Sequence, residues 1–157
     1  MKASNLLSPV LLAVLMAFAK GAHADDLLKA NLRPCVKDGT TFGEVGSCGK
    51  VWKLGSGEAK LDADGKIKVE VKGLVLNDTS TGEFNGTPDG VTDVVATLIC
   101  GGNQVAAMAD RVPLSNPKGE AKIEAKFKMP ASCDKPVILL REIYEGKIGG
   151  WLAGAGF

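Results

Sequence analysis

The chain has 157 residues, with 19 lysines and arginines against 18 aspartates and glutamates, and a formal net charge of +1 at pH 7. Such a near-neutral chain gives no strong case for binding nucleic acid or an anionic membrane through overall charge. Its single histidine, His23, lies near the N-terminus. Removal of that segment on export would leave no histidine, which excludes Ser-His-Asp and Cys-His catalysis and His-ligated zinc, copper or haem.

Residues 1–24 have the layout of a cleaved secretory signal. Lys2 supplies a positive charge, residues 11–19 form an apolar run, and Ala22 and Ala24 are small residues two positions apart before an acidic pair. A membrane anchor is the alternative, but the run is far shorter than the roughly 20 residues that a bilayer requires. We predict cleavage after Ala24, export to the periplasm or the medium, and one domain over residues 25–157 with no membrane span.

All four cysteines fall in the predicted mature chain. In an exported protein an even number of cysteines indicates disulfides. Three pairings are possible, and we predict the local one, which joins Cys35 to Cys48 and Cys100 to Cys133. Metal ligation and redox catalysis are the alternatives, but neither spacing matches the close CxxC pairs of zinc sites or thiol oxidoreductases.

The body of the chain alternates apolar and charged residues. Residues 25–34 fit either a helical turn or an edge strand. Residues 66–72 place Ile67, Val69 and Val71 on one face and charged side chains on the other, and residues 120–129 repeat this pattern. Strands with one dry and one wet face are typical of antiparallel sheets.

Three more apolar stretches, at residues 91–100, 105–109 and 136–143, are predicted strands near the middle of the domain. Residues 101–104 read as a hairpin turn between the first two, and residues 144–147 separate the third from the C-terminal run. Counting from Val51, seven or eight short strands are expected. This spacing predicts an all-β fold, a single antiparallel Greek-key β-sandwich of immunoglobulin-like type that is stapled by the disulfides.

The succession "GSGEAKLDADGKIKVEVKGLVLND", "VVATLICGG", "VPLSNPKGEAKIEAKFKMPASCDKPVILLREI" and "GGWLAGAGF" resembles small exported bacterial proteins of one β-sandwich domain with no assigned activity. The resemblance covers most of the mature chain. It implies the fold and the export, and it carries over no active residue.

A long polar loop at residues 77–93 holds four acidic residues and one aromatic. A flexible connection between sheets is the simpler interpretation. The sharper alternative is a weak calcium site, because clustered oxygen ligands suit a hard cation. Phe84 is the candidate for contact with a ligand or partner. The candidate calcium ligands are Asp78, Glu83, Asp89 and Asp93.

The C-terminal run alternates, with Trp151 and Phe157 on one face, and is predicted as the closing strand of a soluble domain whose core both aromatics plug. It is similar to the last strand of an outer-membrane barrel, which is one alternative, although the seven aromatics of residues 25–157 are too few for two interfacial girdles. The leading prediction is a non-enzymatic binding or structural module with an unknown extracytoplasmic partner and no cofactor. A carboxylate-based enzyme acting on saccharides with two acids is the other alternative.

Overall fold

A computed structural model describes residues 25–88 and 90–157, so the predicted signal peptide lies outside the described part of the chain. Within these two ranges, no helix has the length and apolar character that crossing a bilayer requires.

The described residues form β-strands and one short 3₁₀ helix, and the strands make three antiparallel sheets. The first, here called the charged sheet, has the order β1 (Asp26–Asn31), β4 (Ser56–Asp62), β5 (Lys66–Lys72) and β10 (Ala121–Lys126). The second, the buried sheet, has the order β2 (Arg33–Pro34), β12 (Lys147–Ala155), β11 (Val137–Tyr144), β7 (Asp93–Cys100) and β8 (Gln104–Met108), and β9 (Val112–Pro113) also pairs with β7.

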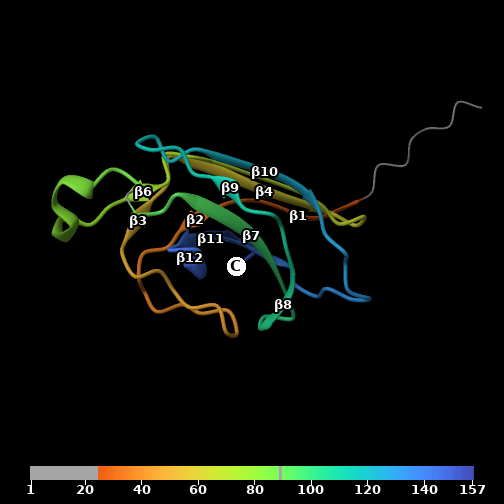
Figure 1. The fold of residues 1–157 in the computed structure, drawn as a ribbon. Helices are drawn as coiled ribbons and strands as arrows, with labels where there is room; N and C mark the ends of the chain where they lie inside the picture. The colour runs from red at the N-terminus through yellow and green to blue at the C-terminus, as the bar shows by residue number, and fades with distance from the viewer. Residues whose placement is uncertain (1–24, 89) are drawn as a thin grey trace, which may run out of the picture.

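A two-stranded ribbon of β3 (Trp52–Lys53) and β6 (Val75–Leu76) completes the strands, and the 3₁₀ helix η1 (Thr79–Phe84) follows it. Figure 1 shows the charged sheet lying over the buried sheet, with the ribbon and η1 at one end of the two layers. One hydrophobic core draws buried residues from all three sheets.

The charged sheet follows the period-two pattern read from the sequence. Ile67, Val69 and Val71 are buried, whereas the lysines at positions 66, 68 and 72 are exposed. On the outer face, three lysine–carboxylate pairs lie within 3.0 Å: Lys60 with Asp26, Lys68 with Glu70, and Lys122 with Glu124. Because these groups are exposed to water, burial of the apolar face contributes most of the stability of this sheet.

The buried sheet is covered on both faces. Every residue of β7 after Asp93 is buried, as are the first four residues of β11. One face packs on the charged sheet, and residues 35–50 fold over the other face (Figure 1). Trp151 fastens this covering loop, because its Nε1 donates to the carbonyl of Thr40 at 2.9 Å and its ring meets Phe42 edge-on at 5.9 Å.

The two disulfides join Cys35 to Cys48 and Cys100 to Cys133, which is the local pairing predicted from the sequence. The first closes the covering loop at its base. The second ties the end of β7 to the segment before β11, where the N–H of Gly101 also donates to the carbonyl of Asp134 at 2.9 Å. Two such bonds indicate an oxidising, extracytoplasmic environment.

The all-β class agrees with the sequence prediction, but the simple sandwich does not, because the strands form three sheets. The immunoglobulin-like Greek key is not confirmed. The predicted strand count began at Val51 and so left out β1 and β2. It could not detect β3, β6 and β9, because strands of two residues are too short to show a periodic pattern.

The C-terminal run agrees with its prediction at Trp151, which is buried in the core, and departs from it elsewhere. β12 lies between β2 and β11, and all five residues from Trp151 to Ala155 are buried, because both faces of this sheet are covered. Register shifts against β11 further break strict alternation. Phe157 is 42% exposed and therefore does not lie in the core. Its ring packs against that of Trp151, with 5.5 Å between the ring centroids.

Candidate functional site

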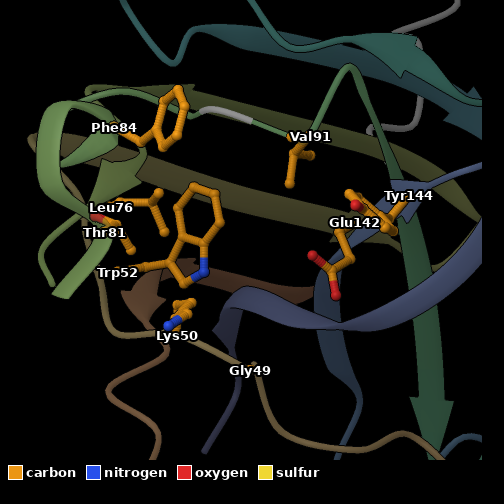
Figure 2. Close-up of a pocket in the computed structure, with 10 residues that line it drawn as sticks. Gly49, Lys50, Trp52, Leu76, Thr81, Phe84, Val91, Glu142 and Tyr144 are labelled. Carbon is orange, nitrogen blue, oxygen red and sulfur yellow. The ribbon is translucent and has the colours of Figure 1, made fainter.

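A pocket of about 380 Å³ opens where the ribbon, η1 and the hairpin of β11 and β12 come together. Figure 2 shows Trp52 and Phe84 on one side of it and Glu142 and Tyr144 on the other. Its walls are mainly apolar and aromatic, with few polar groups. The lining residues are Gly49, Lys50, Trp52, Leu76, Thr81, Phe84, Gly90, Val91, Glu142 and Tyr144.

Trp52 forms the floor of the pocket. It pairs with Leu76 across the ribbon, and its backbone N–H donates to the carbonyl of Cys35 at 2.9 Å. The Cys35–Cys48 disulfide therefore anchors both the covering loop and the strand that carries the indole. Only 4% of Trp52 is exposed, so the ring belongs to the core and also shows one surface to the pocket.

Phe84 lies on the rim, at the end of η1, and is 43% exposed. Asp78 begins this helix by accepting a hydrogen bond from the N–H of Ser80 at 3.0 Å. At the base of the loop, Leu76 exchanges backbone hydrogen bonds of 2.9 Å with Gly86 and Thr87. The polar loop is thus closed by its own bonds and holds an aromatic ring at the pocket mouth.

Tyr144 is the opposite part of the rim and is 52% exposed. It ends β11 beside a two-residue turn, Glu145 and Gly146, in which both residues have positive φ, as a tight hairpin requires. The edge of its ring faces Gly90, where even a Cβ would lie 3.4 Å away. That distance is ordinary van der Waals contact, so the positive φ of +82° is what favours glycine at position 90.

Glu142 brings the one acidic side chain among the described lining residues. Burial raises the pKa of its carboxyl group, and the N–H of Gly150 opposes this shift. Gly149 leaves room for the carboxylate, because a Cβ there would lie 2.6 Å from Oε1. Within the described ranges the ion pairs all lie on the charged sheet, so no cationic side chain neutralises Glu142.

The candidate calcium ligands occupy separate positions in the structure. Asp78 caps η1, and its hydrogen bonds to Ser80 lower the pKa of its carboxyl group. Glu83 is exposed within η1, Asp93 begins β7 and accepts from Thr92 at 2.8 Å, and Asp89 lies outside the described residues. In residues 25–88 and 90–157, no three histidine, cysteine or acidic side chains lie where they could hold a metal ion.

The sequence singled out Phe84, whereas Glu142 and Tyr144 were not predicted to belong to a site. One signal for Glu142 was available. It is a carboxylate in the strand "VILLREIY", whose first four residues are buried. A carboxylate in a largely buried strand is energetically costly unless it is paired or hydrogen-bonded, so it is a candidate for a functional role. Nothing in the sequence shows that residues 52, 84 and 144 share one cavity.

This arrangement suits binding. A pocket of this size with aromatic walls and one polar anchor is typical of small-molecule sites. The two-acid mechanism of the predicted saccharide enzyme needs a second carboxylate facing Glu142 at about 5–10 Å. The lining residues that the structure describes supply none.

Comparisons of the chain with protein-family models, with curated proteins and with solved structures give no match. The β-rich fold and the two disulfides agree with the resemblance to small exported β proteins, but no family is identified.

Proposed function

We propose that this protein is a non-enzymatic binding module that is exported to the periplasm or the medium, and that the pocket between Phe84 and Tyr144 is its binding site. One observation carries the proposal. Both rim aromatics are about half exposed, at 43% and 52%, and they flank an apolar hollow over a buried indole. Exposed aromatics that converge on one cavity are costly in water and favour a ligand-binding role.

The scaffold around the pocket supports this role. The strand that carries Trp52 is hydrogen-bonded to Cys35 of a disulfide, and Asp78 caps η1. Backbone hydrogen bonds at Leu76 close the loop that carries η1, so the pocket walls are held in place before a ligand binds. A preformed site loses less conformational entropy on binding. The presence of only one acid among the described lining residues favours binding without turnover over hydrolysis by paired carboxylates.

A neutral aromatic probe tests the site without assuming its natural ligand. We expect 2-phenylethanol to shift the amide resonances of Phe84, Val91 and Tyr144 in ¹⁵N-labelled protein, and Tyr144→Ala to weaken binding. Met108→Ala is the matched control, because Met108 is an equally exposed apolar residue (49%) on β8, outside the pocket. Shifts confined to other surfaces, or equal losses in both variants, would overturn the proposed site.

A further inference from the structure

Glu142 is a carboxylate that the fold leaves without a cationic partner. It lies partly buried in the pocket wall, where burial opposes ionisation. A desolvated carboxylate is costly unless it is paired or hydrogen-bonded. The N–H of Gly150 supplies part of that compensation and leaves the negative charge facing the pocket.

Arg141, next to Glu142 in the chain, and Lys50, which lines the same pocket, both donate to other acceptors. The Nε of Arg141 donates to the carbonyl of Gly149 at 2.9 Å. Lys50 lines the pocket, but its Nζ donates to Oγ of Ser80 at 3.5 Å. The ion pairs of the described residues include neither of them with Glu142.

Aromatic rings surround the same space. Trp52, Phe84 and Tyr144 all line the pocket, and Figure 2 shows the Glu142 carboxylate across the hollow from Phe84. The negative faces of aromatic rings attract cations, most strongly where water is excluded. A carboxylate without a cationic partner and three aromatic rings in one pocket together favour an organic cation as the ligand.

We propose that the pocket binds a small organic ammonium ion, with its charged group at Glu142 and its apolar body against Trp52, Phe84 and Tyr144. This inference rests on the proposed binding function and names its ligand class. The volume of about 380 Å³ lies at the lower end of the range for small-molecule sites, which favours a free amine of modest size.

Three probes with one skeleton test the charge preference: 2-phenylethylamine as the cation, 2-phenylethanol as the neutral form and 3-phenylpropanoate as the anion. Their dissociation constants are measured at pH 7 by ¹⁵N chemical-shift titration of the full mature chain. We expect the amine to bind about tenfold more tightly than the alcohol, as one charge-assisted hydrogen bond provides. The carboxylate should bind most weakly.

Glu142→Gln keeps the shape of the side chain and removes its charge. It should weaken amine binding about tenfold and leave alcohol binding unchanged. Glu145→Gln is the matched control, because Glu145 is exposed on the turn of the same hairpin, does not line the pocket, and loses the same charge. This control should bind the amine as the wild type does.

The outcomes separate the two proposals. Equal binding of all three probes with shifts at the pocket, tighter binding of the carboxylate, or no effect of Glu142→Gln on amine affinity would overturn the ammonium inference and leave the binding site standing. If none of the probes shifts a lining residue, the binding function itself fails, and the ligand class fails with it.

Discussion

Trp151 joins the buried sheet to the loop that covers it, so replacing it tests how the fold is held together. It is 2% exposed, its ring meets Phe42 and Phe157 edge-on at 5.9 and 5.5 Å, and its Nε1 donates to Thr40 at 2.9 Å. Truncating a buried tryptophan to alanine costs about 3–5 kcal/mol. Edge-on ring pairs contribute beyond burial, so we expect a loss near the upper end, about 5 kcal/mol.

A second substitution separates the indole N–H from the ring. Trp151→Phe keeps an aromatic ring in place but removes the donor, which leaves the Thr40 carbonyl without this partner. Such a loss costs about 1–3 kcal/mol. The expected order of stability is therefore wild type, then Trp151→Phe, then Trp151→Ala.

Urea unfolding followed by far-UV circular dichroism measures these losses, with the disulfides kept oxidised and the free energy extrapolated linearly to water. Phe84→Ala is the control, because this ring is 43% exposed and should cost less than half as much. A Trp151→Ala loss below about 1 kcal/mol, which is ordinary for a surface position, would show that Trp151 does not hold the covering loop on the buried sheet. Equal losses in the two alanine variants would show the same.

Three further predictions concern the covering loop and the pocket wall. Replacing Cys35 and Cys48 together by serine should lower the free energy of unfolding by about 3 kcal/mol, measured by calorimetry, and an unchanged melting temperature would contradict this. Gly150→Ala places a Cβ 2.5 Å from a carbonyl oxygen of the covering loop and should cost about 1–3 kcal/mol in urea, whereas Gly46→Ala, which meets nothing within 4 Å, should cost less. Burial raises the pKa of Glu142 above its ordinary 4.5, so ionisation costs stability as the pH rises through the raised pKa. Glu142→Gln should therefore be more stable than the wild type at pH values above the raised pKa and no more stable below pH 4.5. A gain in stability that does not depend on pH would contradict the raised pKa.

The local part of the fold was readable from the sequence because its signals are local. Ile67, Val69 and Val71 alternate with charged residues, and the structure buries the apolar set. The turn before Lys147 follows from a glycine between two predicted strands. In both cases the neighbouring residues carry the whole signal.

The covering loop could not be predicted in this way. Residues 35–50 show no periodicity, and the hydrogen bond that fastens them joins Thr40 to Trp151, 111 positions later. Because the loop covers the buried sheet, the residues from Trp151 to Ala155 are buried on both faces of the strand. The alternation in the sequence therefore did not separate a buried face from an exposed one. Contacts at this separation leave no pattern in a single sequence.

Only one wall of the pocket could be predicted from the sequence. The long polar loop and Phe84 marked one wall, since long loops with an exposed aromatic often carry function. Its other wall comes from the end of β11, more than 50 positions later in the chain. The acidic residues of the loop suggested a weak calcium site as an alternative to a flexible connection, and in the structure one of them, Asp78, caps η1. Short polar side chains fit both roles equally well in sequence.

Ligand binding between Phe84 and Tyr144, over Trp52, can be observed directly. The most direct measurement is the set of intermolecular nuclear Overhauser effects between unlabelled 2-phenylethylamine and the isotope-labelled protein. We expect cross-peaks from the probe to the rings of all three aromatics, which line one pocket. Cross-peaks to the exposed face of the charged sheet, with none to these rings, would contradict binding at this pocket.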